Sequence, residues 1–179
     1  MVKYVARSSH SYLRKNQGLK LSLGICCCWI VLFAQPVLSQ PARPTISILD
    51  THTRLLDLYR QVFTIGKDLS QLRKALGIRD PERSIVSSLV ESNKYILAYV
   101  AHAMDVLWLY QNMSSPKDRE NVRKSVGASL KELVKLSELE IEATNDAIAN
   151  TDKPGIVSTA TELRNATRQI IDALNAVQL

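Results

Sequence analysis

His102 and Asp105 are a pair of side chains in this sequence that could form a catalytic or metal-binding site. They lie three positions apart. At that spacing a helix brings a carboxylate next to an imidazole, either to orient a general base or to share a metal ion with it. A projection at about 100° per residue puts both in a polar strip with Glu91 and Lys94, which favours a solvated pair instead. His52 projects beside aromatic residues near a helix end, and we expect it not to meet His102.

The sequence lacks the common metal and cofactor motifs. Metal sites in helical bundles use Glu-x-x-His repeats, but Leu49 and Tyr99 stand where the glutamates would be. Covalent haem attachment needs Cys-x-x-Cys-His, whereas the three cysteines are consecutive at residues 26–28. No Gly-rich phosphate loop or Gly-x-Ser-x-Gly segment occurs. We therefore expect no catalytic residue, no cofactor and no metal ligand, and we rank an enzyme or metalloprotein last.

Glu140 projects onto the apolar side of its segment, where an unpaired carboxylate is costly. Counting outward from the turn near Asp152 places Arg164 at the same level, and Arg73 is also close in height. No second titratable group converges on this position, so we expect a structural ion pair of Glu140 with Arg164 or Arg73 rather than a catalytic acid.

Most of the net positive charge of the chain lies in its first 20 residues. The chain has 23 Lys and Arg against 17 Asp and Glu. Five of the basic residues precede residue 21 and every acidic residue follows residue 40, which leaves 18 basic against 17 acidic residues in the remainder. A nucleic-acid-binding domain needs basic charge clustered on the folded part. We expect no nucleic-acid partner.

Residues 1–39 have the order of a signal peptide: a basic segment, an apolar run at 21–34, and small residues before a cleavage site. The run is shorter than the ~20 residues that span a membrane. Val37 and Ser39 favour cleavage after residue 39, and the alternative is an uncleaved membrane anchor. We expect an exported protein, periplasmic or extracellular, in which prolines keep residues 40–45 extended as a linker.

Beyond the linker, apolar residues recur at alternating spacings of three and four, which is typical of amphipathic helices. Gly77 is placed to end the first helix in a left-handed conformation, and Asp80 with Pro81 to start the second. Short turns separate the remaining segments. The sequence predicts one domain at 46–179, an all-α, up-down-up-down antiparallel four-helix bundle. We expect its helices at about 46–76, 81–113, 116–150 and 154–178.

The second of these helices has an apolar arc of roughly 220°, against the ~100° stripe that a surface helix usually needs. A bundle covers one broad side of each helix, so part of this arc is left over. We expect an interaction surface anchored by a tryptophan, made of Val86, Val90, Leu97, Met104 and Trp108. The alternative is that the linker, or long side chains of a neighbouring helix, cover these residues.

Three classes of function remain open. The favoured one is a non-catalytic accessory protein that binds a protein partner or itself through the second helix. The next is a carrier of a small apolar ligand between helices, near Tyr95, Tyr99 and Trp108. An enzyme or metalloprotein comes last. The most apolar segment, at 94–113, is interrupted by ionisable residues, so we expect the mature domain not to lie in a membrane.

Overall fold

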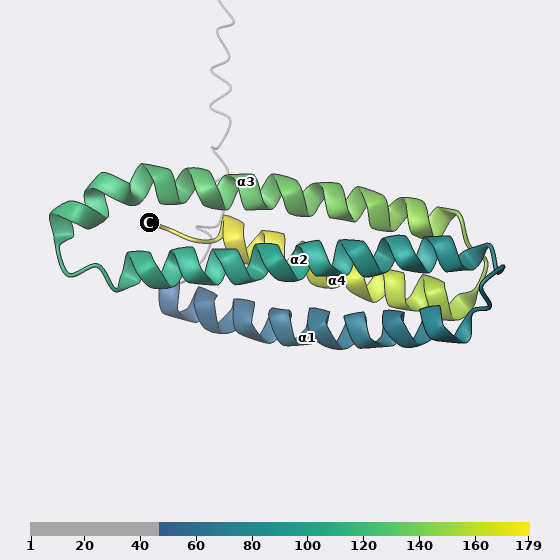
Figure 1. Cartoon of the computed structure of the whole chain (residues 1–179). Coiled ribbons are helices and arrows are strands. Elements are labelled where there is room, and N and C mark those ends of the chain that lie inside the picture. The colour runs from purple at the N-terminus through teal and green to yellow at the C-terminus, as the bar shows by residue number, and fades with distance from the viewer. Residues whose placement is uncertain (1–46) are drawn as a thin grey trace, which may run out of the picture. The chain divides into compact units, whose positions relative to one another are not determined.

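The computed structural model describes residues 47–179, so the predicted signal peptide and linker lie outside the described residues. These residues form four helices and no strand (Figure 1), namely α1 (Ile48–Ala75), α2 (Glu82–Gln111), α3 (Pro116–Ala149) and α4 (Pro154–Asn175). The prediction of an all-α, four-helix fold is confirmed. The helix bounds lie within three residues of the expected ones. In this part of the chain, no helix is long and apolar enough to cross a membrane.

Three of the four helices, α1, α2 and α3, begin next to a side chain that satisfies a free backbone amide. Ser47 accepts a hydrogen bond from the amide of Asp50, at 3.1 Å, and Ser115 accepts one from the amide of Asp118, at 3.3 Å. Asp80 does the same for the amide of Glu82, at 2.9 Å. Such hydrogen bonds replace the partners that the first turn of a helix lacks.

The end of α1 differs from the prediction. The backbone of Gly77 is not left-handed. The helix ends because Leu76 turns to an extended conformation, at ψ 133°. The guanidinium of Arg83, in α2, then donates to the backbone carbonyls of Arg73 and Leu76, at 2.9 and 2.7 Å. A side chain of the next helix therefore satisfies the carbonyls that a left-handed glycine usually helps to satisfy.

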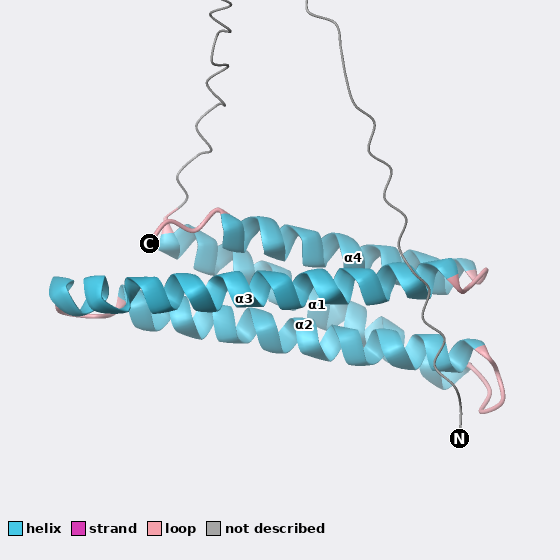
Figure 2. Ribbon diagram, turned by 90° about the horizontal axis from the view of Figure 1, so that it is seen from above, coloured by secondary structure: helices cyan, strands magenta, loops and turns pink. Residues whose placement is uncertain are grey.

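The helices lie side by side, with α2 and α4 between α3 on one side and α1 on the other. The two perpendicular views agree on this arrangement (Figures 1 and 2). Accordingly α2 contacts all three other helices, whereas α1 and α3 do not contact each other among the described residues. Small buried residues of α4, Ala160, Ala166 and Ala173, let neighbouring backbones come close.

The core follows the seven-residue repeat of the apolar positions. Leu55, Val62 and Leu69 of α1 are completely buried at this spacing, and so are Leu163 and Ile170 of α4. Burial of each such side chain contributes about 1.5–3 kcal/mol to the stability of the fold. The core therefore fixes which face of α1 remains outside, and the candidate surface lies on that face.

Candidate interaction surface on α1 and α2

Gly66 and Asn93 set the spacing between α1 and α2. Asn93 is 3% exposed, and its Nδ2 donates across the helix pair to the carbonyl of Val62, at 2.8 Å. A Cβ atom at Gly66 would lie 2.3 Å from Asn93 Oδ1, a distance that no real contact reaches. A larger residue is therefore disfavoured at Gly66, because the buried amide occupies the space of a side chain.

A groove of about 380 Å³ lies along this contact. Apolar side chains of Phe63, Val90 and Leu97 line it, and Lys67, Lys74 and Lys94 are the charged residues of its wall. The ammonium group of Lys67 lies 4.8 Å from the centre of the Phe63 ring, a cation–π contact. Its remaining lining is Gly66, Ser70, Gln71 and Asn93. We call this feature the lysine groove.

Apolar side chains continue from the lysine groove toward the start of α1. Leu49 and Leu56 precede Phe63 by fourteen and seven residues, so they share its face of α1 to within about 40°. On α2, Trp108 follows Val90 by eighteen residues, or five helical turns, and points in the same direction. We call the following six residues the apolar row: Leu49, Leu56 and Phe63 of α1 with Leu97, Met104 and Trp108 of α2.

Much of the apolar row is accessible to solvent. The exposed fractions are 59% for Leu49, 48% for Phe63 and 55% for Trp108. Leu56, Leu97 and Met104 are half-buried between them. Single exposed apolar residues are ordinary in soluble proteins, and Leu109 and Leu139 are examples here. A row that runs along two adjacent helices is less ordinary and indicates a contact surface.

The structure corrects part of the surface predicted on α2. Val86 is completely buried and Val90 is 6% exposed, so both belong to the core. Leu97 and Met104 are half-buried against that core, and Trp108 is exposed. Val90 lines the groove between α2 and α1, so this part of the wide apolar arc of α2 packs against a neighbouring helix. The α1 half of the surface was not predicted, although Leu49, Leu56 and Phe63 repeat every seven residues.

The predicted ion pair of Glu140 is wrong. Among the described residues, no Lys or Arg nitrogen lies within 4.0 Å of its carboxylate. Arg164 donates instead to the side-chain oxygen of Asn145, at 3.1 Å, and the half-buried Arg73 contributes its backbone carbonyl to the contact with Arg83. Side chains tilt toward the N-terminus of their own helix. Arg164 therefore leans toward the α3–α4 turn, whereas Glu140 leans away from it.

Glu140 lies instead near Tyr99 of α2. Burial raises the pKa of Tyr99 above its usual range, and the negative charge of Glu140 raises it further. The ring of Tyr99 also stacks on that of Tyr95, with 6.4 Å between centroids and 17° between planes. Tyr99 follows Val90 by nine residues, which puts it on the side of α2 opposite to Trp108. Tyr99 and Trp108, which the carrier hypothesis groups together, therefore face opposite sides of α2.

The two histidines lie on different helices and in different surroundings. His102 is exposed on α2 and His52 is half-buried on α1. Among residues 47–179, no group of three or more His, Cys, Asp or Glu side chains is placed to hold a metal ion.

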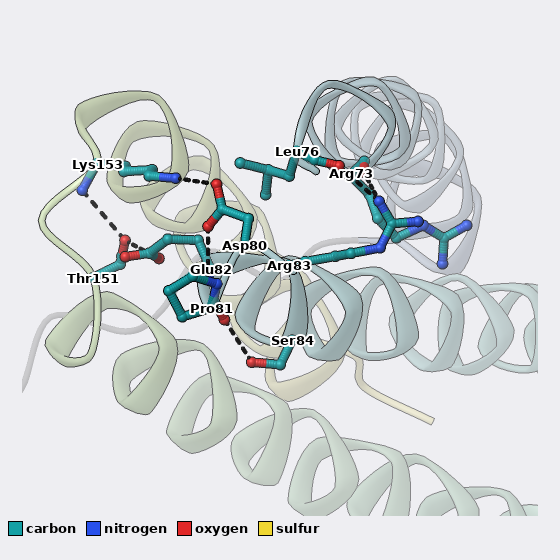
Figure 3. A network of polar contacts seen from close by, with 9 residues as sticks. All are labelled: Arg73, Leu76, Asp80, Pro81, Glu82, Arg83, Ser84, Thr151 and Lys153. Atoms are coloured by element: carbon teal, nitrogen blue, oxygen red, sulfur yellow. Dashed lines mark hydrogen bonds and ion pairs between the residues drawn. The ribbon is translucent and has the colours of Figure 1, made fainter. Parts of the chain in front are cut away.

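A polar network joins the α1–α2 loop to the α3–α4 loop (Figure 3). Asp80 accepts from the ammonium group of Lys153, at 2.8 Å, and Thr151 donates its hydroxyl to the carboxylate of Glu82, at 2.6 Å. The hydrogen bond from Lys153, followed by that from the amide of Glu82, lowers the pKa of Asp80 below its usual range. The network holds one end of the molecule together and is separate from the apolar row.

Comparisons with known proteins do not assign a function: no family model, curated protein or solved structure matches this chain.

Proposed function

We propose that this protein is a non-catalytic interaction or accessory subunit that binds a protein partner, or a second copy of itself, through the apolar row. The single observation that carries the proposal is the exposure of Phe63 and Trp108 on neighbouring helices, with half-buried apolar residues between them. Tryptophan and other large aromatic side chains contribute most of the binding energy in many interfaces. Trp108 is the anchor of this surface.

Two further assignments accompany the proposal. The four helices form an up-down-up-down antiparallel bundle, supported by short loops and by contacts between consecutive helices. Residues 1–39 are a signal peptide, supported by the order of basic, apolar and small residues. N-terminal sequencing of the exported protein tests the second assignment. A start at Gln40 is expected, and an intact Met1 or Val2 contradicts cleavage.

Site-specific photo-crosslinking in the cell that makes the protein tests the interaction. A photoreactive residue at position 63 or 108 should give a defined crosslinked product, and the same residue at 109 or 139 should not. Leu109 is a matched control because it adjoins Trp108 and is equally exposed, at 57% against 55%, but projects about 100° away. If no position gives a product, or if positions 109 and 139 give the same product, the proposal is wrong.

A pair of alanine variants separates the interface from the core. Trp108→Ala should remove the crosslink from position 63 and leave helicity and Tm nearly unchanged. Leu107→Ala should instead cost about 2–5 kcal/mol of stability, because Leu107 is completely buried. If Trp108→Ala unfolds the protein, Trp108 belongs to the core. Analytical ultracentrifugation of both variants distinguishes self-association from binding of another protein.

A further inference from the structure

The lysine groove places positive charge at the Phe63 end of the apolar row. Three lysines and no carboxylate line it. Lys94 contacts Glu91, at 2.7 Å, but both side chains are more than half exposed. An exposed pair of this kind contributes about 0–1 kcal/mol, so it competes weakly with a carboxylate from a partner. Lys67 is already aligned on the ring of Phe63. The groove therefore combines apolar contact with positive charge.

The charge of the surface changes sign along α2. Asp105 follows Lys94 by eleven residues, which puts the two side chains on nearly the same line of the helix. Asp105 is exposed beside the Trp108 end of the apolar row. The lysines attract carboxylates of a partner that lies along the apolar row, whereas Asp105 repels carboxylates at the Trp108 end. The charges therefore select both an acidic partner and its direction.

The shape of the surface favours a helix over a lipid or small molecule. Leu49, Leu56 and Phe63 repeat every seven residues, as do positions that pack against another helix. The lysine groove is open along its length, and its ~380 Å³ lies at the lower end of the range for ligand pockets. A fatty acid there leaves much of its chain in water, whereas an amphipathic helix buries its apolar stripe and keeps its polar face outside.

We propose that the apolar row binds an amphipathic helix of a partner protein, with carboxylates of that helix in the lysine groove. This inference rests on the proposed function and adds the chemistry and direction of the partner. The apolar stripe of the bound helix covers Phe63 and Trp108. Its acidic end contacts Lys67, Lys74 and Lys94, and its other end, beside Asp105, is neutral or basic.

Selection from a displayed library of random 18-residue peptides, with the purified full-length protein as bait, tests this inference. Selected peptides should combine a helical apolar stripe with Asp or Glu at one end. Their affinity should fall with added salt, and at least tenfold in the double variant Lys67→Glu, Lys94→Glu. The matched control is Lys131→Glu, Lys135→Glu on α3, where both lysines are exposed and lie outside the lysine groove. The control should bind like wild type.

Each of the other outcomes contradicts one stated part of the inference: the acidic partner, the proposed function, or the identity of the occupant. Peptides without acidic residues that still need Trp108 overturn the acidic partner and leave the proposed function standing. A library that gives no peptide dependent on Phe63 or Trp108 overturns both. If vesicles of equal phosphatidylcholine and phosphatidylglycerol bind more tightly than the peptides, the occupant is a membrane. Self-association that Lys67→Glu abolishes identifies the occupant as a second copy of this chain.

Discussion

Substitution of Gly66 by alanine tests the close contact that shapes the surface. The new Cβ atom would lie 2.3 Å from Asn93 Oδ1 and 3.1 Å from its Cγ. Alanine favours a helix over glycine by about 1 kcal/mol. Against this gain, crowding in a packed core costs about 1–3 kcal/mol, and a buried amide displaced from its carbonyl partner costs a similar amount. The two costs overlap, because displacement of Asn93 is what relieves the crowding.

We expect a net destabilisation of about 2 kcal/mol, or roughly 8 °C in Tm for a domain of this size. Urea and thermal denaturation followed by circular dichroism measure both quantities. The matched control is Gly127→Ala in α3, where the new Cβ atom meets Leu179 Cδ1 at an ordinary 3.6 Å. At this position alanine also favours the helix over glycine, but its Cβ atom is not crowded. Gly127→Ala should therefore stabilise the protein by about 0.5–1 kcal/mol.

A double-mutant cycle identifies the crowded atom. In the Asn93→Ala background the amide is gone, so Gly66→Ala should stabilise by about 1 kcal/mol instead of destabilising. If Gly66→Ala costs the same in both backgrounds, or is as harmless as Gly127→Ala, the contact with Asn93 does not hold the helices at this distance.

Two further predictions concern titrating groups. The lowered pKa of Asp80 means that its pairing with Lys153 stabilises the fold above the unfolded aspartate pKa, near 4. This stabilisation is lost as pH falls through the folded pKa, and Asp80→Asn should make acid unfolding less dependent on pH in that range. The raised pKa of Tyr99 means that its neutral form stabilises the fold below pH ~10 and that this contribution is lost as pH rises through the folded pKa. Removal of the neighbouring charge by Glu140→Gln should lower the pKa of Tyr99 measured by ¹³C NMR, and an unchanged value would contradict the effect of this charge on Tyr99.

The helices could be predicted from the sequence because their signals are local. Ser47 and Ser115 start helices as capping residues do, and the apolar repeats set their faces. The position where α1 ends was predicted to within one residue, but the contacts that satisfy its last carbonyls could not be predicted in this way. The carbonyls near Leu76 are satisfied by Arg83, a residue of the next helix, and the sequence between them does not specify that contact.

The candidate site shows the same division between local and non-local information. Counting residues from the turn placed Glu140 and Arg164 at one level, but counting ignores the direction in which side chains tilt. The width of the apolar arc on α2 predicts more surplus surface than the structure leaves exposed. Part of the arc, at Val86 and Val90, is buried in the core instead, which becomes visible once the helices are placed together. Exposure of Trp108 followed correctly from the projection, whereas burial of Val86 and Val90 did not.

Two hydrogen-bonded contacts hold the walls of the lysine groove together before any partner binds. Asn93 joins α2 to the carbonyl of Val62, and ten residues earlier Arg83 joins it to the last carbonyls of α1. A groove fixed at both ends needs little reorganisation on binding, which preserves affinity. Arg83→Ala should therefore speed hydrogen exchange at residues 70–76 more than at 48–58 and cost about 1–2 kcal/mol of stability. Arg79→Ala, at an exposed neighbour, should do neither. Equal acceleration along the whole of α1 would show that Arg83 supports the fold in general and not this wall of the groove.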